Sequence, residues 1–383
     1  MTPRAYTTWI VAGCLALLAP VLALNLLLLA NDSRHDKNRL ASRWQQESGG
    51  VTYAPPINNN RAFKTLRLHG RLNDINALAF GSSTVMSLTA DAWPSGIRAY
   101  NFAQSGNSLL SVLGEADYVL NHWPDRIRVL LIPLDWALGF TYQGGALPPT
   151  DLDAEQVPPP APLPVVAALR EALSLPRIQE LGAILRDIVR ADDPRAAARQ
   201  FFLEPASAPY RCTDGQLARD YSTVHRGLCN GFRADGSATF ADQKRIGAAE
   251  APAVIARAAS ASSQYAQALA RAQGGPDAQL LQHLGGIIAN ARSRGVQILL
   301  FMPPLMPELD ARLEASAHSG VQLRQTKTML RQWAQQHQVP LFDGGPSERY
   351  GCLPTEFIDA HHALPDCYRK FMKQIFANRK VLP

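Results

Sequence analysis

The chain has 383 residues, of which 46% are hydrophobic, and a formal net charge of +6 at pH 7. This length and apolar content suit one large or two medium domains with a substantial core. The positive charges are spread along the chain, without the clusters of arginine and lysine interleaved with aromatic residues that nucleic-acid binding requires, so the composition argues against a nucleic-acid partner.

Residues 1–30 predict a membrane anchor. No charged residue occurs from Thr8 to Ala30, and this stretch is long enough for a helix to cross about 30 Å of hydrocarbon. One cation precedes the stretch and three follow it closely, so the flanking charges do not set the orientation. A short leading segment stays in the cytoplasm easily, which favours an inside amino end. A cleaved signal peptide is the alternative.

Residues 31–72 have the composition of a polar stalk, with a turn at Pro55-Pro56. The chain then alternates between apolar runs and helical patterns. The expected strands cover 75–81, 97–101 and 127–134, and the expected helices cover about 84–92 and 109–122. Such alternation predicts an α/β fold with a doubly wound parallel sheet, beginning near residue 73 and continuing to residue 383.

The alternation breaks at Gly139. A proline-rich, acidic stretch precedes amphipathic helices around 165–173 and 177–189, so residues about 140–245 are expected to form a mainly helical insertion. The α/β pattern then resumes. Its expected elements are helices over 251–272, 277–294 and 321–338, strands over 296–301 and 339–342, and a closing helix from Pro365.

Four of the five cysteines form two closely spaced pairs, Cys212 with Cys229 and Cys352 with Cys367. An even number at local spacing, behind a membrane segment, predicts two disulfides in an oxidising compartment. Neither pair has the CxxC spacing of a zinc site, so we expect no metal. The globular part is therefore expected outside the cytoplasm.

The first strand runs into Phe80-Gly81-Ser82-Ser83. An unbroken apolar run that ends in small residues is typical of a buried parallel strand entering a tight turn. Open α/β sheets bind ligands outside the carboxyl ends of their strands, and a helix starting near Thr84 would direct its free N–H groups to the same place. A serine here is a candidate nucleophile.

A second motif, Asp359-Ala360-His361-His362, comes before the last helix. A serine hydroxyl needs an imidazole to take its proton, and the imidazole needs a carboxylate to fix its tautomer. Asp359 and His362 lie three residues apart on one loop and meet both needs. His361 is an alternative base, and Ser82 is an alternative nucleophile to Ser83. A Cys352–Cys367 bridge would enclose this loop.

Three blocks in this order resemble the SGNH (GDSL-type) hydrolase and acyltransferase superfamily, across roughly residues 74–380 apart from the insertion. The blocks are Gly81-Ser82-Ser83, Asn101-Phe102-Ala103-Gln104-Ser105-Gly106 and Asp359-Ala360-His361-His362. The resemblance implies a flavodoxin-like, three-layer fold without a cofactor. It implies that Ser83 is the nucleophile, His362 the general base and Asp359 its orienting carboxylate, and that Gly106 lends a backbone N–H to the oxyanion hole.

The chain departs from this family in its third block. The family usually has Gly-x-Asn-Asp, whose asparagine completes the oxyanion hole, whereas the equivalent strand end here is Ile132-Pro133-Leu134-Asp135-Trp136. Asp135 either caps a helix, bonds the serine turn or does neither, and Trp136 either shapes an acceptor site or only packs. Asn107 either contributes an amide to the site or caps the next helix. The departure makes the chain similar to the membrane-anchored branch that moves D-alanyl or acetyl groups onto envelope polymers.

We therefore expect a serine-dependent O-acyl (acetyl) transferase that acts on a cell-envelope or exported polysaccharide through an acyl-serine. The expected location is the inner (cytoplasmic) membrane, crossed once, with the globular domain in the periplasm. The expected partners are the glycan, the membrane and a multispanning membrane acyltransferase that delivers the acyl group. The alternatives are a membrane-anchored carbohydrate esterase or deacetylase, and a noncatalytic envelope scaffold with the same fold.

Overall fold

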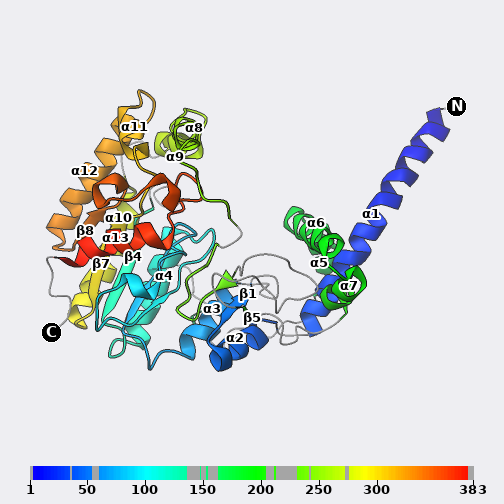
Figure 1. Ribbon diagram of the computed structural model, residues 1–383, viewed down its shortest axis with the longest axis horizontal. Coiled ribbons are helices and arrows are strands. Elements are labelled where there is room, and N and C mark those ends of the chain that lie inside the picture. Colours follow the sequence, from blue (N-terminus) through cyan, green and yellow to red (C-terminus); the bar gives the residue numbers. More distant parts are fainter. Residues whose placement is uncertain are drawn as a thin grey trace. The chain divides into compact units, whose positions relative to one another are not determined.

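The structure is a computed structural model, and it forms two compact units, which we describe separately (Figure 1). The first contains Met1–Asn59 and Val157–Gly231, and the second contains Asn60–Gln156 and Phe232–Pro383. Within these units, the described residues are 3–34, 37–53, 60–135, 147, 152–153, 163–203, 211–212, 231–240, 243–271 and 276–377.

The first unit is built on a long helix, α1 (Pro3–Arg34). Three helices pack against it: α5 (Val165–Ala172), α6 (Leu175–Arg190) and α7 (Pro194–Phe202). Two side-chain amides of α1 fix this packing, because Asn25 donates to the Ala172 carbonyl at 2.7 Å and Asn31 donates to the Phe201 carbonyl at 3.0 Å. The unit also contains α2 (Lys37–Ser48) and an antiparallel pair of short strands, β1 (Val51–Tyr53) and β5 (Arg211–Cys212).

The expected helices of the insertion are thus present as α5 and α6. The expected membrane anchor is helical as well, within α1. However, none of the helices formed by the described residues is both long enough and apolar enough to cross a bilayer. The structure therefore gives the predicted anchor no support.

The second unit is an α/β fold around a parallel sheet. Its strands are β2 (Ala77–Ala79), β3 (Ala99–Asn101), β4 (Val129–Pro133), β7 (Gln297–Met302) and β8 (Leu341–Asp343), in the order β3-β2-β4-β7-β8. The residues of β2 and β4 are all buried, as their unbroken apolar sequences predict. The expected α/β class with a parallel sheet is confirmed. The strand order reverses between β2 and β4, and such reversals are where open sheets bind ligands.

Eight α-helices of the described residues belong to this unit: α3 (Asn60–His69), α4 (Leu109–His122), α8 (Ala251–Ala258), α9 (Gln264–Arg271), α10 (Ala278–Ser293), α11 (Leu309–Ala315), α12 (Gly320–Gln336) and α13 (Pro365–Ala377). Short 3-10 helices occur at η1 (Ala90–Ala92), η4 (Ser347–Tyr350) and η5 (Pro354–Glu356), and β6 (Gly231–Phe232) lies at the boundary between the units. Helices α4 and α10 pack together, and α13 contacts η1.

The segment predicted as a helix over 84–92 forms a series of turns that ends in η1. The Asn101 side-chain amide donates to the carbonyls of Val85 and Leu88, both at 2.8 Å, and the Ala238 N–H donates to the Met86 carbonyl at 2.7 Å. These tertiary bonds occupy acceptors that an α-helix would need. The prediction that a helix N-terminus points its N–H groups at the serine is therefore wrong.

Two other boundaries differ from the expected ones. The helix predicted over 251–272 is interrupted between α8 and α9, where the Ser263 hydroxyl accepts the Ala266 N–H at 3.1 Å and so caps α9. Residues 60–69, assigned to the stalk from the sequence, form α3, whose Phe63 and Leu68 are fully buried.

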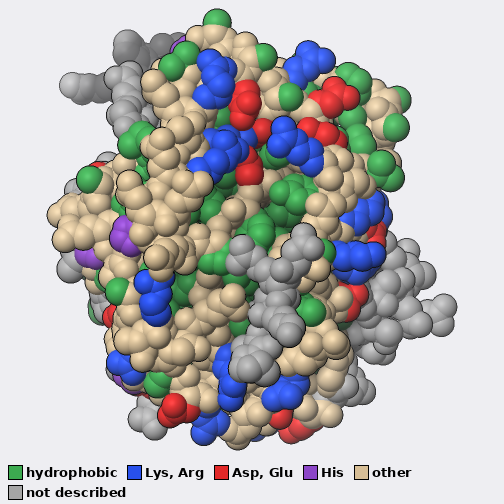
Figure 2. Space-filling view, turned by 90° about the vertical axis from the view of Figure 1, so that its left-hand side faces the viewer, with side chains coloured by type: hydrophobic (Ala, Val, Ile, Leu, Met, Phe, Trp, Pro, Cys, Tyr) green, Lys and Arg blue, Asp and Glu red, His purple; other side chains and the backbone are tan. Residues whose placement is uncertain are grey.

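Basic and acidic side chains are interspersed over the face of the molecule in Figure 2. Charges of both signs lie close together there, so that face presents no extended field of a single sign.

Candidate active site

Ser83 lies in the turn that follows β2, at the carboxyl edge of the sheet. Gly81 makes this turn possible. Its φ is +141°, and a Cβ at this position would come within 2.8 Å of both the Pro133 ring and a Val85 methyl group. Only glycine combines that φ with so close an approach. The turn is closed by the Val85 N–H, which donates to the Ser82 carbonyl at 3.1 Å.

The neighbouring Ser82 is buried and engaged within the turn. Its Oγ lies 2.9 Å from the Thr84 Oγ1, and both hydroxyls donate to the Asp135 Oδ2, at 3.2 and 3.3 Å. Asp135 follows β4, so it joins the two strands on either side of the switch point. Of the roles left open for Asp135, bonding the serine turn is the one observed.

Hydrogen bonds connect Ser83, His362 and Asp359 in a row. The Ser83 Oγ lies 2.9 Å from His362 Nε2, and His362 Nδ1 lies 2.6 Å from Asp359 Oδ2. In the tautomer with its proton on Nδ1, the imidazole donates to the carboxylate and presents the Nε2 lone pair to the hydroxyl. The structure thus brings together the three residues that the sequence proposes as nucleophile, base and orienting carboxylate. This is the geometry needed to remove a proton from the serine.

Asp359 also shapes its own loop. Its Oδ1 accepts the backbone N–H groups of His361 and His362, each at 2.9 Å, so the loop folds around the carboxylate. Burial raises the pKa of Asp359, but hydrogen bonds and charge from His361 and His362 together outweigh burial and hold this pKa well below its usual range. The carboxylate therefore stays ionised at neutral pH, where it can stabilise an imidazolium.

His361 occupies a supporting position. Its ring centroid lies 4.1 Å from that of His362, its Nδ1 lies 3.1 Å from Asp359 Oδ1, and the Tyr265 ring meets it edge-on at 5.3 Å. His362 is thus the histidine that contacts Ser83. Asp359, His361 and His362 place ligand atoms within 4.8 Å of one another and could hold a metal ion. In the structure, however, two of these three side chains are bonded to each other.

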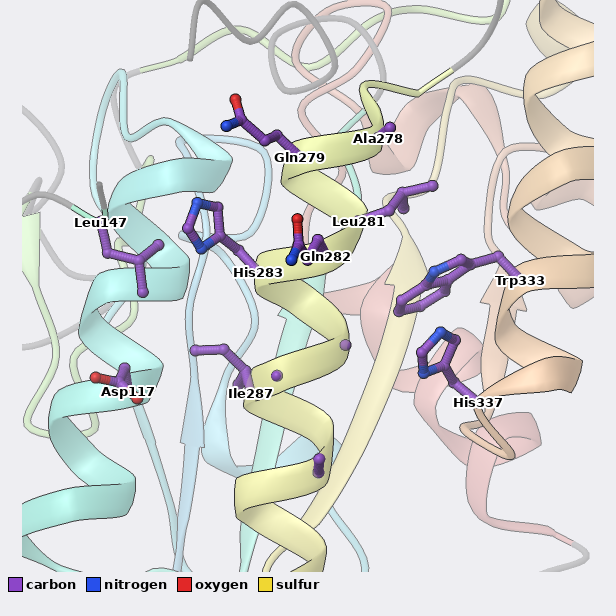
Figure 3. Close-up of a pocket in the computed structure, with 13 residues that line it drawn as sticks. Asp117, Leu147, Ala278, Gln279, Leu281, Gln282, His283, Ile287, Trp333 and His337 are labelled. Atoms are coloured by element: carbon purple, nitrogen blue, oxygen red, sulfur yellow. The ribbon is translucent and has the colours of Figure 1, made fainter. Parts of the chain in front are cut away.

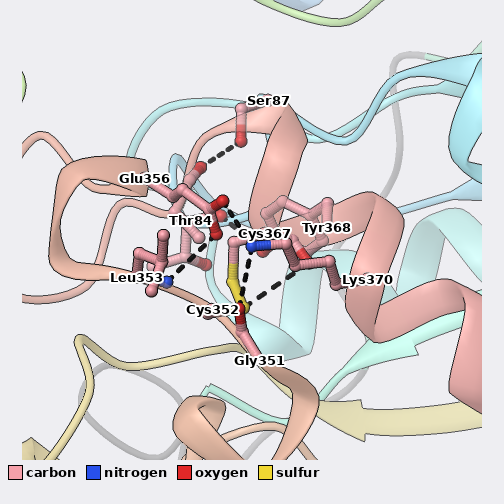
Figure 4. Close-up of a disulfide and its surroundings, with 10 residues drawn as sticks. Thr84, Ser87, Gly351, Cys352, Leu353, Glu356, Cys367, Tyr368 and Lys370 are labelled. Atoms are coloured by element: carbon pink, nitrogen blue, oxygen red, sulfur yellow. Dashed lines mark hydrogen bonds and ion pairs between the residues drawn. A yellow bond between two sulfur atoms is a disulfide. The ribbon is translucent and has the colours of Figure 1, made fainter.

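A disulfide between Cys352 and Cys367 encloses the histidine loop, as the sequence predicts (Figure 4). Next to it, Glu356 accepts the Leu353 N–H at 3.1 Å and the Lys370 ammonium at 2.5 Å. Helix α13 is thus joined to the loop both covalently and by an ion pair. The other predicted disulfide cannot be placed, because Cys229 lies outside the described residues.

Three further contacts hold the histidine loop in its place. The Tyr368 hydroxyl on α13 donates to the Thr84 carbonyl at 2.6 Å, and the Ser87 hydroxyl donates to the Ala363 carbonyl. The Met306 N–H donates to the Ala360 carbonyl, within the histidine loop, at 3.0 Å. The first contact joins the serine turn to α13, and the second joins it to the histidine loop, although more than 270 residues separate the two partners of each contact in the sequence.

The block that carries Gly106 lies against the serine turn. The Phe102 N–H donates to the Ala79 carbonyl at 2.7 Å, and the Gln104 N–H donates to the Gly81 carbonyl at 2.9 Å. Gly106 itself has a φ of +68°, a left-handed conformation that favours glycine. The backbone after β3 therefore runs beside the backbone after β2 as far as the serine turn.

Asn107 does not cap the next helix, which was one of the two roles left open for it. The cap of α4 is Ser108, whose hydroxyl accepts the Ser111 N–H at 3.1 Å. The Asn107 amide instead donates to both carboxylate oxygens of Glu115, each at 3.2 Å, and its oxygen accepts from Arg61 at 3.0 Å. Trp136, the other predicted substrate-binding residue, lies outside the described residues.

Sequence reasoning missed the side chains that support this site: Arg61, Lys64, Ser87, Asn101, Glu115 and Tyr368. Asn101 carried one usable signal, because it ends the expected strand 97–101 and begins the second motif block. The others lie on helices or turns whose partners are distant in the sequence.

A large groove lies away from these residues. It has a volume of about 1030 Å³ and runs along α10. Its lining includes His283 of α10, Trp333 of α12 and His337, which follows α12 (Figure 3). Its lining does not include Ser83, His362 or Asp359. This groove and the candidate catalytic groups are therefore separate features.

No protein-family model matches the chain, and a search of curated proteins finds no match to it. The resemblance to the SGNH superfamily therefore stays an expectation from the three sequence blocks.

Proposed function

We propose that this protein is a serine-dependent O-acyltransferase of the SGNH type, which moves an acyl (acetyl) group through an acyl-serine intermediate. One observation carries the proposal: the continuous hydrogen-bonded row from the Ser83 hydroxyl through His362 to the Asp359 carboxylate. The position of this row at the switch point of a parallel sheet supports it further.

In the proposed reaction, the Ser83 Oγ attacks the carbonyl carbon of an acyl ester while His362 Nε2 takes the hydroxyl proton. Asp359 holds the imidazolium that forms, and the backbone N–H of Gly106 donates to the developing oxyanion. When the tetrahedral intermediate collapses, the bond to the leaving alkoxide breaks and His362 returns the proton to it. An acceptor hydroxyl then attacks the acyl-serine by the reverse sequence, which regenerates Ser83.

The proposed acceptor is a hydroxyl of a cell-envelope or exported polysaccharide. The support is the resemblance to the acyl-transfer branch, together with the Cys352–Cys367 disulfide, which suits an oxidising compartment such as the periplasm. Anchoring in the inner membrane and delivery of the acyl group by a multispanning membrane protein are parts of the same proposal. The reaction steps at Ser83 do not depend on them.

Labelling with a fluorophosphonate tests the nucleophile. We expect the full chain to be labelled once, Ser83→Ala to be unlabelled, and Ser262→Ala to be labelled like the wild type. Ser262 is a matched control because it is an exposed serine in the loop before α9. A well-folded wild-type chain that resists the reagent would instead favour the noncatalytic scaffold.

Transfer and hydrolysis share every step up to the acceptor, so they need a separate experiment. An activated acetyl ester is offered with and without candidate envelope oligosaccharides, and acetylated sugar and free acetate are both measured. Transfer predicts that acetylated sugar outruns acetate. If only acetate forms, whichever sugar is present, the protein is an esterase and the transferase proposal fails.

A further inference from the structure

Helix α3 brings a fully buried lysine to the block that carries Gly106. The Lys64 Nζ donates to the Asn101 carbonyl at 3.2 Å and, over a shorter contact, to the Ala103 carbonyl. The same ammonium lies 4.9 Å above the ring of Phe232. Both carbonyls belong to the segment that leads from β3 to the proposed oxyanion donor.

A second cation of α3 holds the far end of this segment. Arg61 forms an ion pair with Glu115 at 2.7 Å and donates to the Asn107 side-chain oxygen at 3.0 Å. The Asn107 amide completes the triangle by donating to Glu115, whose side chain is fully buried. The residue directly after Gly106 is therefore fixed by two charged partners.

These two anchors lie on either side of the proposed donor. Lys64 fixes the carbonyls at positions 101 and 103, and Arg61 with Glu115 fixes the side chain at position 107. Gly106 lies between them in a left-handed conformation without a side chain of its own to anchor it. An oxyanion donor stabilises a transition state well only if it is already in place before the reaction, because moving it then would cost free energy.

Burying a cation costs free energy, so a buried lysine such as Lys64 indicates a role other than packing. Burial lowers the pKa of Lys64 to about 7, even though the charges of Asp235 and Glu115 favour its protonated form. An apolar side chain of similar volume would avoid this cost, since replacing buried charges with packed apolar groups is often neutral or stabilising. The presence of lysine therefore calls for a benefit other than packing, and bonding two carbonyls of the proposed oxyanion block provides one.

We propose that Lys64 and Arg61 are positioning residues that preset the segment 101–107, and with it the Gly106 N–H, for stabilising the oxyanion. This inference rests on the acyl transfer proposed above. It assigns to α3, a helix outside the three motif blocks, a direct effect on the rate of the reaction through the backbone geometry of the oxyanion hole.

The test compares an activated ester with its thionoester, in which sulfur replaces the carbonyl oxygen. Sulfur is larger and a weaker hydrogen-bond acceptor, so preset N–H donors favour the ester far more than the thionoester. The ratio of the two rates reports the quality of the oxyanion hole, and it does not depend on how much of the preparation is folded. It is measured with the full chain as wild type, Lys64→Met and Arg61→Met.

We expect Lys64→Met and Arg61→Met to lower kcat for the ester roughly 10- to 100-fold, with little change in KM. This decrease in kcat should not exceed the decrease caused by removing one oxyanion donor. The ester-to-thionoester ratio should fall with kcat. Arg61→Lys should recover part of both. Lys327→Met is the matched control, because Lys327 is also buried but bonds Asp310 and Glu314 on α11. Its ratio should equal that of the wild type.

Equal losses for ester and thionoester in both variants, with an unchanged ratio, would overturn the positioning role and leave the acyl-transfer proposal standing. A wild-type chain with no turnover that depends on Ser83 would overturn both. The two failures are therefore distinguishable in a single set of assays.

Discussion

The serine side and the histidine side of the candidate site are held in place by different means. The serine turn continues a buried strand, and its geometry is set by Gly81, by Asp135 at the end of the next strand and by the amide of Asn101. The histidine loop contains one isolated bridge, between Phe357 and Ala363, and is closed by a disulfide.

The difference follows from where each part lies in the fold. Parallel strands fix the positions of the turns at their carboxyl ends, so the serine needs only local bonds between neighbouring strands. A loop outside the sheet has no such frame. A cross-link restricts the unfolded chain and holds the loop ends together, which gives a similar result by covalent means. One side should therefore respond to loss of hydrogen bonds and the other to loss of the disulfide.

Removing the carboxylate of the histidine side should have the largest effect on activity. Asp359→Asn keeps the shape of the side chain but no longer holds the proton on His362 Nδ1, so the imidazole can adopt the wrong tautomer. We expect kcat to fall by about 10⁴-fold, as such changes do in serine hydrolases. The rate is measured with an activated acetyl ester. Asp366→Asn, an ion-paired aspartate at the start of α13, is the matched control and should retain most of the activity.

Removing the disulfide should act on the same side through stability. The bridge joins residues 15 apart, so replacing both cysteines, in Cys352→Ser with Cys367→Ser, should cost about 3 kcal/mol of unfolding free energy. Urea denaturation measures this cost. Because the bridge encloses Asp359 and His362, activity should fall at denaturant concentrations where the sheet is still folded. If activity and the folded sheet were lost at the same denaturant concentration, the loop would have no separate dependence on the disulfide.

The sequence predicted the parts of this architecture that depend on local patterns. The strand leading to Ser83 is an apolar run that ends in a glycine-containing turn, and Asp359 with His362 has a spacing that suits contact within one loop. The even number and local spacing of the cysteines, behind an expected membrane segment, predicted the Cys352–Cys367 pair. In each of these cases the partners are close in sequence, or the parallel sheet brings their strand ends to one edge.

The failures arise where tertiary contacts decide. The helix predicted over 84–92 is replaced by turns because Asn101, on another strand, bonds its carbonyls. A lysine in an amphipathic helix is normally exposed, so no sequence pattern predicts that Lys64 is buried. Asn107 precedes a helix and looks like a cap, but the pairing of Arg61 with Glu115 across two helices takes up its side chain.

On the serine side, removing the amide of Asn101 should have a smaller effect than removing the disulfide. Asn101→Ala leaves the carbonyls of Val85 and Leu88 without their donor in a buried site, which should cost about 2 kcal/mol of unfolding free energy. The rate should fall as well, because the serine turn is released. Asn121→Ala is the control, since this exposed amide bonds Asp117, Asn290 and Arg294 at the surface and should change stability by less than about 0.5 kcal/mol.

The smallest expected effect is a rise in the free energy of unfolding as the pH increases above 7. This effect is expected on the serine side only. The charged and aromatic groups that act on the Lys64 ammonium are Asp235, Glu115 on α4 and the ring of Phe232. Burial wins over the two carboxylates and lowers the pKa of Lys64 to about 7, whereas an unfolded lysine titrates near 10.5. Between these values the unfolded chain binds more protons than the folded chain, so stability rises with pH.

From pH 7 to pH 8 this one group should add about 1 kcal/mol to the free energy of unfolding, since a full proton difference is worth about 1.4 kcal/mol per pH unit. Below pH 7 both states are protonated and the contribution to the slope disappears. Urea denaturation of the wild type and Lys64→Met at pH 6, 7, 8 and 9 measures it. The variant should lose this part of the slope. Lys327→Met should keep it, because burial lowers the pKa of Lys327 but the neighbouring carboxylates together outweigh burial and hold this pKa above its usual value. Parallel curves for the wild type and Lys64→Met would mean that Lys64 is not held in a water-free site, and that the serine side relies on hydrogen bonds to strand ends without the buried cation.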